Sequence, residues 1–406
     1  MRIAVATVGT TGDIAPFVLL ARRLVERGHD VTAVTWPVHR SSFSTPGVRV
    51  EVAGPHADPA RITAVAAEAA RRGPMEQVAL LREFHLAGGE DHYRRLCTVL
   101  AGHDLVVLHG IHALAQAAVI DLGLAWATAV FDPVLLPSDD APPPGMPGLG
   151  PLNGLAWWVL DRALQRAARP LDDVLSRAGS RQRGLPLFRG RSDRLHLLAC
   201  SAAIVREARG WPAGTRLTGA WLDRSPRAPL PDALDRFLAD GAPPVVVALG
   251  SMSGAAEAVI DAAVGAVLAG GRRVVAQGGV AASIESPSLL HVGSVDHRAL
   301  FPRASAVIHH GGAGTTHAAC AAGVPSVVVP HVGDQRYWAE RLHRLGVAPR
   351  PILVSDLTPE ALAEAALATA ADADRRHAAA ELGRRLSTED GLGTAVGLIE
   401  SIAADA

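Results

Sequence analysis

The chain has 406 residues, of which 49% are hydrophobic and 19% are charged, and its formal net charge is −1. This composition is typical of a globular protein and excludes a disordered chain. The nearly neutral charge argues against a nucleic-acid-binding protein, which needs an excess of cations to displace counterions from phosphates. The length exceeds what one hydrophobic core usually supports, so we expect two domains of roughly 200 residues each.

The three cysteines, Cys97, Cys200 and Cys320, are far apart and form neither a zinc motif nor a disulfide framework. A reducing cytoplasm is therefore the expected compartment. The N-terminal run MRIAVATVGTTGD loses its apolar character at Gly9, so it indicates a first strand rather than a signal peptide. No apolar run reaches the roughly 18 residues of a membrane-spanning helix, and we expect no such span.

Short runs rich in Val, Ile and Leu alternate along the chain with longer segments rich in Ala, Leu and Arg. Continuous apolar runs of this length indicate parallel strands buried on both faces. In chain order the expected strands are 2–8, 31–35, 48–52, 104–109, 126–131, 195–200, 244–250, 272–277, 305–310 and 326–330. The first intervening segment, APFVLLARRLVERG, predicts a helix with Pro16 near its start and Gly28 just past its end. The alternation predicts an α/β fold with right-handed crossovers.

The strand pattern restarts after RSPRAPLP (224–231), a stretch rich in Pro and Arg that indicates a linker. We therefore expect residues 1–224 and 225–406 to form two doubly wound, Rossmann-like domains that face a central cleft. Another stretch rich in Pro and Gly, 137–154, is interpreted as a mobile loop of the first domain because strand-like segments follow it. Surface loops of this kind often carry recognition residues.

The motif HHGGAGTTH (309–317) lies directly after an expected strand and directly before an Ala-rich segment. In α/β domains, ligands bind outside the carboxyl ends of strands, where a helix N-terminus offers unpaired N–H groups and a positive dipole end. Glycines allow close approach of the backbone to phosphate oxygens, and the motif's threonines can add hydroxyl donors. The motif thus indicates a cradle for a phosphate, with His309 as a further donor.

A metal site is the first alternative for this motif, and a tight turn that needs glycines for steric reasons alone is the second. The metal site is disfavoured because the adjacent His309 and His310 face opposite sides of a strand. His317 lies within the following helix, and no carboxylate or cysteine stands nearby at ligand spacing. His310 and His317 are therefore interpreted as structural.

Polar residues also follow two other expected strands at the same edge of the second sheet. Asp334 and Gln335 follow the strand ending at Pro330, and a carboxylate beside an amide suits the paired hydroxyls of a sugar. Gly250 and Ser251 follow the strand 244–250. Taken alone, the first pair could equally be ordinary residues at a helix N-terminus, and the second a simple turn.

Together these segments resemble the donor-binding half of GT-B nucleotide-sugar glycosyltransferases, most of all the bacterial natural-product and sterol glucosyltransferase group. The likeness extends over HHGGAGTTHAACAAGVPSVVVPHVGDQ, residues 309–335. The resemblance implies roles for a set of residues. The donor diphosphate would be bound by His309, Gly312, Gly314, Thr315 and Ser251, the sugar by Asp334 and Gln335, and the nucleobase by Val295 in the loop 291–302.

The segment GTTGDIAPFVLLA resembles the first loop of the same family, in which glycopeptide- and sterol-type members carry Asp where others carry His. We therefore expect Asp13 to act as the general base that removes the proton of the acceptor hydroxyl. The alternative is that Asp13 only caps the helix. If Pro16 is the first helical residue, however, the cap is Ala15, and Asp13 stands two positions too early.

The acceptor-side candidates are Thr11, His109, Trp126 and Phe131. Thr11 lies in the first loop, and His109 follows the strand 104–108 and could contact the acceptor or assist Asp13. A structural role is the alternative for His109 and for its neighbour His112. The aromatic residues, including the pair Trp157–Trp158, could pack against an apolar acceptor or belong to the core.

The sequence thus predicts an inverting, metal-independent glycosyltransferase of secondary metabolism that needs no cofactor. It would move a sugar, possibly a deoxysugar, from a dTDP- or UDP-sugar to a hydroxyl of a small, largely apolar natural product. Such an acceptor would be a polyketide, macrolide or glycopeptide aglycone. The alternatives are a sterol or lipid glucosyltransferase using UDP-glucose, or a catalytically silent protein that binds sugar nucleotides. The expected partners are small molecules, and the protein would be a monomer or homodimer with its last helix (391–406) returning to the first domain.

Overall fold

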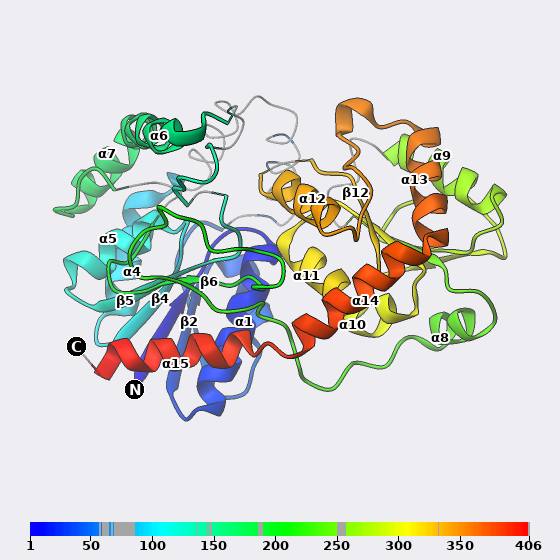
Figure 1. Ribbon diagram of the computed structural model, residues 1–406. Helices are drawn as coiled ribbons and strands as arrows, with labels where there is room; N and C mark the ends of the chain where they lie inside the picture. Colours follow the sequence, from blue (N-terminus) through cyan, green and yellow to red (C-terminus); the bar gives the residue numbers. More distant parts are fainter. Residues whose placement is uncertain are drawn as a thin grey trace. The chain divides into compact units, whose positions relative to one another are not determined.

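A computed structural model of the protein describes residues 1–56, 58, 65, 68, 86–134, 136–143, 146, 148–185, 190–249, 257–331 and 333–404. The chain divides into two compact units. The N-terminal unit comprises Met1–Ala202, Arg206–Leu222 and Asp390–Ala406, and the C-terminal unit comprises Ala203–Val205 and Asp223–Glu389. Each unit is built on a parallel sheet, so the expected α/β fold class is confirmed (Figure 1).

The sheet of the N-terminal unit has the strand order β3-β2-β1-β4-β5-β6-β7, and all of its pairings are parallel. Its strands are β1 (Arg2–Ala6), β2 (Asp30–Thr35), β3 (Val48–Val52), β4 (Leu105–His109), β5 (Ala125–Val130), β6 (His196–Leu198) and β7 (Thr215–Leu217). The strands β2 and β3 are added on one side of β1, and the strands from β4 onward are added on its other side, so the strand order reverses between β1 and β4. In open α/β sheets, ligands bind outside the carboxyl ends of strands at such a switch point.

Successive residues of these strands face opposite layers of the core. Ile3 and Val5 of β1 pack with α1, whereas Ala4 and Ala6 pack in the cluster that includes α4 and α5. The helices of this unit are α1 (Thr11–Glu26), η1 (Pro37–Phe43), α4 (Gly89–Leu100), α5 (Ala113–Asp121), η2 (Gly150–Leu152), α6 (Asn153–Ala167), α7 (Arg169–Ala178) and α15 (Gly391–Ala404). The apolar character of the strand sequences thus reflects burial on both faces.

The last helix, α15, belongs to the N-terminal unit and packs beside α1 (Figure 1). Val396 and Ile399 of α15 are fully buried in the same cluster as Leu20 of α1. At the surface, Glu400 accepts hydrogen bonds from the Arg27 guanidinium at 2.9 and 3.2 Å. The two ends of the chain therefore share one core layer.

The sheet of the C-terminal unit has the order β10-β9-β8-β11-β12, which repeats the 3-2-1-4-5 order of the first sheet. Its strands are β8 (Val245–Ala248), β9 (Val274–Gln277), β10 (Leu289–Val292), β11 (Ala306–His309) and β12 (Ser326–Val328). Its helices are α8 (Asp232–Ala239), α9 (Glu257–Ala269), α10 (His297–Leu300), η4 (Phe301–Arg303), α11 (Ala313–Ala321), α12 (Gln335–Arg344), η5 (Val354–Asp356), α13 (Pro359–Ala371) and α14 (Ala373–Ser387). By this correspondence, β11 occupies the place of β4.

Two strands and one helix boundary differ from the sequence expectation. The strands β7 and β10 were not expected, because their short sequences TRL and LLHV carry few of the signals that longer strands show. Helix α1 begins at Thr11 with Thr10 as its N-cap, so Pro16 lies inside the helix and Ala15 is not the cap. Pro16 cannot donate a hydrogen bond to the Gly12 carbonyl, and the helix nevertheless continues through this position to Glu26.

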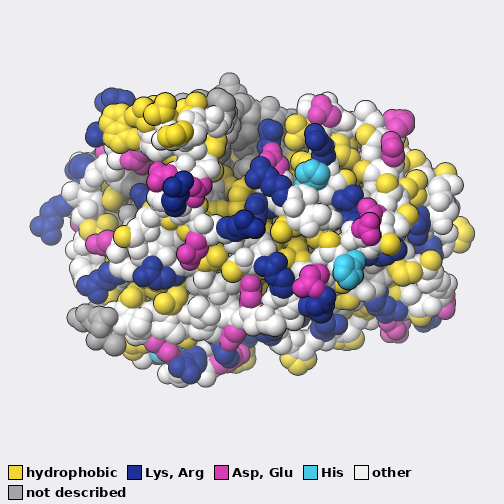
Figure 2. All heavy atoms as spheres, viewed as in Figure 1, with side chains coloured by type: hydrophobic (Ala, Val, Ile, Leu, Met, Phe, Trp, Pro, Cys, Tyr) yellow, Lys and Arg dark blue, Asp and Glu magenta, His cyan; other side chains and the backbone are white. Residues whose placement is uncertain are grey.

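An exposed apolar surface lies on α6 and the segment before it, at the upper left of Figure 2. Its side chains include Leu152, Leu155, Trp158 and Val159. Trp158 is 57% exposed and is therefore not a core residue, whereas its neighbour Trp157 is 4% exposed and donates its indole N–H to the Ala141 carbonyl. Among the residues that the structure describes, no helix is long and apolar enough to cross a membrane.

Candidate functional site

Asp13 lies in the first turn of α1, directly after β1 at the switch point of the first sheet. Its Oδ2 atom accepts hydrogen bonds from the Thr10 backbone N–H at 2.8 Å and from the Thr10 hydroxyl at 2.9 Å. Asp13 thus caps the helix from inside, as the third helical residue, and not from the N-cap position. Gly9, with φ +117°, makes room for this arrangement because any side chain there would collide with the carboxylate.

The other carboxylate oxygen of Asp13 faces His109, the last residue of β4. The distance from Asp13 Oδ1 to His109 Nε2 is 3.4 Å, which is an ion-pair distance and longer than an ordinary hydrogen bond. His109 Nδ1 accepts the Ile111 backbone N–H at 3.1 Å, so the neutral ring carries its proton on Nε2. His109 therefore presents a hydrogen-bond donor to the carboxylate.

The surroundings of Asp13 favour its ionised form. Burial raises the pKa of this carboxyl, but hydrogen bonding and the charge interaction with His109, together with the Thr10 donors, outweigh that effect. The pKa of Asp13 consequently lies below its ordinary value. Because the side chain still keeps 29% of its surface exposed, it is an ionised acceptor that a substrate can reach.

A second carboxyl group, Asp132, interacts electrostatically with both His109 and Asp13. It stands two residues past the end of β5, the strand that pairs with β4. Burial, with a contribution from Asp13, raises the pKa of Asp132 despite the backbone N–H of Val134 that it accepts at 2.8 Å. Asp132 is not among the candidates predicted from the sequence, although its place just after a parallel strand is a signal that could have identified it.

Three of the acceptor-side candidates lie at the carboxyl edge of the first sheet. Phe131 packs beside His109, with ring centroids 5.3 Å apart, and meets Phe17 edge-on at 5.8 Å. Thr11 is exposed as the first residue of α1. His109 is the third of them and contacts Asp13 as described above. His112 is instead the N-cap of α5, and its ring lies 5.3 Å from that of His92.

Trp126, the fourth acceptor-side candidate, is instead a core residue. It is 8% exposed and belongs to the core cluster that includes Leu96 and Leu175. Trp126 pairs with Val106 near the start of β5, three strand residues (about 10 Å) before the level of His109. Its position at the far end of the strand gives it a packing role.

In the C-terminal unit, the HHGGAGTTH motif forms the connection from β11 to α11, at the switch point between β8 and β11. His309 repeats the arrangement of His109, because its Nδ1 accepts the Gly311 backbone N–H at 3.1 Å. Its Nε2 therefore carries the proton. This atom is buried and has no hydrogen-bond partner among the described residues.

His309 is neutral at any physiological pH, because burial, followed by the nearby His310 and His297, lowers its pKa to about 3. A buried donor without a partner is costly, which makes His309 Nε2 a candidate donor to an acceptor from outside the described residues. The hydroxyl of Thr316, in the second turn of the motif's helix, is a further buried group without a partner in the described chain.

The glycines of the motif have different steric roles. Gly311 has φ +88°, and a side chain there would meet Val328 Cγ1 at 2.8 Å and the Gln335 carbonyl at 2.9 Å. A Cβ on Gly314, the second residue of α11, would meet nothing within 4 Å. With Gly312 as N-cap, the first-turn amides up to Thr315 have no intrahelical acceptor and create a positive helix end.

The three histidines of the motif do not converge. His310 has a pKa lowered to about 4 by burial, with His331 as the next cause. His317 Nδ1 lies 2.8 Å from the Ala313 carbonyl within α11. In the described part of the chain, no three His, Cys, Asp or Glu side chains are grouped as metal ligands.

Asp334 and Gln335 follow β12 and begin α12, with Asp334 as the N-cap. Asp334 Oδ2 accepts the indole N–H of Trp338 at 2.7 Å. The Gln335 side-chain carbonyl accepts the His331 backbone N–H at 2.7 Å, so the side-chain NH₂ group of Gln335 points away from that N–H. The pair thus combines a carboxylate acceptor with an amide donor near the start of one helix.

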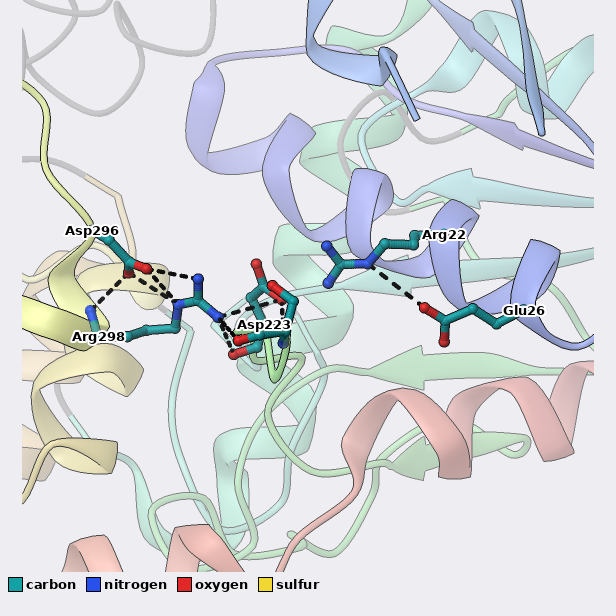
Figure 3. Close-up of polar contacts among 6 residues, drawn as sticks. Arg22, Glu26, Asp223, Asp296 and Arg298 are labelled. Carbon is teal, nitrogen blue, oxygen red and sulfur yellow. Dashed lines mark hydrogen bonds and ion pairs between the residues drawn. The ribbon is translucent and has the colours of Figure 1, made fainter. Parts of the chain in front are cut away.

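Val295 lies in the loop between β10 and α10, and its side chain packs on the core cluster that includes Leu300. Arg298 holds this loop in place (Figure 3). Its guanidinium forms an ion pair with Asp296 at 2.6 Å and donates to the carbonyls of Asp223 and Ser225 at 3.0 and 2.9 Å. Ser251, the remaining donor-side candidate, lies outside the described residues.

The chain is similar to proteins of a known family. The family model described as "Erythromycin biosynthesis protein CIII-like, C-terminal domain" matches residues 277–390. That span contains the loop of Val295, the motif at 309–317 and the pair Asp334–Gln335.

Relatives match over nearly the whole chain. The O-mycaminosyltylonolide 6-deoxyallosyltransferase of Streptomyces fradiae is 33% identical over 425 residues, covering 98% of this chain and 97% of the relative. The vancomycin aglycone glucosyltransferase of Amycolatopsis orientalis is 33% identical over 381 residues, covering 90% of each chain. The crystal structure of the glycosyltransferase VinC in complex with dTDP has a TM-score of 0.70 at 21% identity and covers 100% of both chains.

Proposed function

The chain belongs to the GT-B nucleotide-sugar glycosyltransferases of natural-product biosynthesis, and on this premise we propose its reaction and its substrates. The N-terminal unit binds a small acceptor and supplies the base, and the C-terminal unit binds the nucleotide sugar. The donor is a dTDP- or UDP-sugar, with a deoxysugar as the first choice. The acceptor is a hydroxyl of a largely apolar aglycone of the polyketide, macrolide or glycopeptide type.

One observation carries this proposal: the buried Nε2–H of His309, at the end of β11 before the loop that begins α11, has no hydrogen-bond partner among the residues that the structure describes. A neutral imidazole donor and the positive helix end are both suited to the diphosphate of a sugar nucleotide. The backbone amides of Gly312, Gly314 and Thr315 and the Thr315 hydroxyl complete this donor set. As diphosphate leaves, the same groups stabilise the negative charge that develops on it.

The reaction is a single displacement with inversion at the anomeric carbon. The acceptor oxygen forms the new bond to that carbon while the bond to the diphosphate oxygen breaks and its electron pair leaves with the nucleotide. The proton of the acceptor hydroxyl passes to Asp13. Because the pKa of Asp13 lies below its ordinary value, this carboxylate removes the proton late, when the hydroxyl has become acidic.

Asp334 and Gln335 hold hydroxyls of the transferred sugar, and backbone groups at Val295 contact the nucleobase. The names of the relatives support the choice of substrates, since one transfers a 6-deoxyallosyl group and another acts on the vancomycin aglycone. The structural neighbour with bound dTDP supports dTDP as the first nucleotide to test. The three unpaired cysteines support the cytoplasm as the compartment.

The substrates are tested by a screen in which dTDP- and UDP-sugars are crossed with macrolide, other polyketide, glycopeptide and sterol acceptors. Mass spectrometry detects each product as an acceptor that has gained one sugar. We expect turnover with at least one natural-product aglycone and a dTDP-sugar. Turnover confined to sterols with UDP-glucose would contradict the proposed acceptor class, and nucleotide binding without transfer to any acceptor would indicate a silent binding protein.

The base is tested by Asp13→Asn, which keeps a side-chain oxygen to accept the Thr10 N–H and so preserves the helix cap. We expect kcat to fall by roughly 10²- to 10⁴-fold, the usual contribution of a positioned general base. The affinity for dTDP, measured by calorimetry, should not change, because the nucleotide binds the other unit. Full transfer activity in a folded Asp13→Asn variant would rule out Asp13 as the base.

A further inference from the structure

Trp338 occupies an unusual position for a core residue. It lies one turn into α12 and is fully buried, with 0% of its surface exposed. Its single polar atom, the indole N–H, donates to Asp334 Oδ2 at 2.7 Å. The largest side chain of this helix therefore directs its only hydrogen-bond donor at the carboxylate that follows β12.

The indole bond fixes the orientation of that carboxylate. Asp334 stands at the N-cap of α12, and its own carbonyl accepts the Trp338 backbone N–H at 3.1 Å. The two residues are thus linked through both the backbone and the side chains. Because the indole donates to one oxygen of a planar carboxylate, this bond sets the plane in which the carboxylate offers its acceptor positions.

The ring of Trp338 is itself held by His317. The two rings meet edge to face, with centroids 4.9 Å apart and an interplanar angle of 74°. His317 is 4% exposed, and its Nδ1 lies 2.8 Å from the carbonyl of Ala313, the first residue of α11. The contacts therefore run from the first turn of the diphosphate-binding helix, through His317 and Trp338, to Asp334.

We propose that Trp338 is the positioning residue for the transferred sugar, because its indole N–H orients the Asp334 carboxylate. His317 fixes the position of the Trp338 ring relative to α11, the helix that binds the diphosphate. The inference rests on the proposed function. It assigns a role to His317, the last histidine of the HHGGAGTTH motif. In this role His317 fixes the position of the sugar-binding groups relative to the diphosphate-binding groups. A Trp that only fills the core would have no selective effect on the sugar.

The test compares the binding of a nucleotide sugar with that of the nucleotide alone, in the full-length protein and by calorimetry. Trp338→Phe keeps an aromatic ring and removes the N–H. The affinity for the dTDP-sugar found in the substrate screen should fall about tenfold or more, as expected for the loss of a hydrogen bond to a charged group. The affinity for dTDP, which has no sugar, should stay within about twofold of the wild-type value.

Two outcomes overturn the proposal: equal losses for both ligands, which indicate a structural role, and no loss for either. Trp158→Phe, at an exposed indole of the N-terminal unit, is the control and should change neither affinity. Should Trp338→Phe not fold, site-specific replacement of Trp338 by benzothienylalanine removes the N–H and keeps the shape, with the same expected outcomes.

A double-mutant cycle with Asp334→Asn adds a second criterion. If Trp338 acts through Asp334, the loss in the double variant should be smaller than the product of the two single losses. Independent, multiplicative losses would contradict the proposal. Wild-type protein that binds no nucleotide sugar would refute the proposed function itself, whereas wild-type binding without a sugar-selective loss at Trp338 refutes only this inference.

Discussion

Asp13 uses its two carboxylate oxygens for different tasks. Oδ2 completes the cap of α1 through Thr10, and Oδ1 faces His109 at 3.4 Å. Helix capping and base chemistry are therefore compatible in one residue, because the cap occupies one oxygen and fixes the direction of the other. His109 is fixed in turn by the Ile111 N–H, which determines the ring nitrogen that carries the proton.

This arrangement predicts how the pH dependence responds to a change at His109. His109→Phe keeps the packing against Phe17 and Phe131 but removes the donor that lowers the pKa of Asp13. With that donor lost, the pKa of Asp13 rises, and the acid limb of the kcat/KM profile should move to higher pH. The measurement is a pH–rate profile from about pH 4 to 8 with a fixed acceptor. An unmoved acid limb would show that His109 does not act on Asp13.

At the scale of elements, the same strand–turn–helix connection fixes a histidine ring in the same way in both units. The β4–α5 and β11–α11 connections each begin with a histidine whose Nδ1 accepts a backbone N–H two residues later. Neither Nε2 atom has a hydrogen-bond partner in the described chain, but that of His109 lies 3.4 Å from Asp13 Oδ1, at ion-pair distance. The difference lies in what the neighbouring element supplies: α1 brings a carboxylate to His109, whereas no described residue of the second unit brings a hydrogen-bond acceptor to His309 Nε2.

The glycines of the β11–α11 connection predict separable effects on stability and binding. Gly314→Ala places a methyl group where nothing lies within 4 Å, so the free energy of unfolding should be unchanged or rise by up to about 1 kcal/mol. The affinity for dTDP should nevertheless fall, because the methyl group obstructs the approach of phosphate to the backbone. Urea denaturation and calorimetry measure the two quantities.

Gly311→Ala is the matched comparison, because its methyl group would collide with Val328 and the Gln335 carbonyl at φ +88°. It should lower the free energy of unfolding by about 1–3 kcal/mol as well as the affinity. Equal stability losses in both variants would contradict the assignment of Gly314 to the open side of the loop.

At the scale of the whole molecule, both units bury histidines in neutral form. Burial lowers the pKa of His196 to about 4 and that of His309 to about 3, with nearby cationic or imidazole groups as smaller causes. In the unfolded chain these side chains titrate near their ordinary pKa of about 6.5. Between these values the unfolded state binds more protons than the folded state, so acidification favours unfolding.

We therefore expect the free energy of unfolding to fall as the pH drops from about 6.5 to 5, by up to about 1.4 kcal/mol per pH unit for each such histidine. Above about pH 6.5 these groups are neutral in both states and contribute no slope. Urea denaturation at several pH values measures the effect. His196→Gln should reduce the slope, and His291→Asn, at an exposed site, should not. A flat dependence between pH 8 and 5 would contradict the buried, neutral state of these histidines.

The sequence by itself determined the α/β class, the order of most strands along the chain and the positions of residues at or after strand ends, such as Asp13, His309 and Asp334. These features are local, since apolar runs, glycines and strand ends are visible in a continuous stretch of chain. The sequence could not place Trp126 at the far end of its strand, identify Asp132 beside His109 or find the bond from Trp338 to Asp334. Those relations depend on strand register, on side-chain direction and on the packing of helices distant in sequence. Only the tertiary structure brings the carboxyl ends of β1, β4 and β5 together, and only there do Asp13, Asp132 and His109 interact.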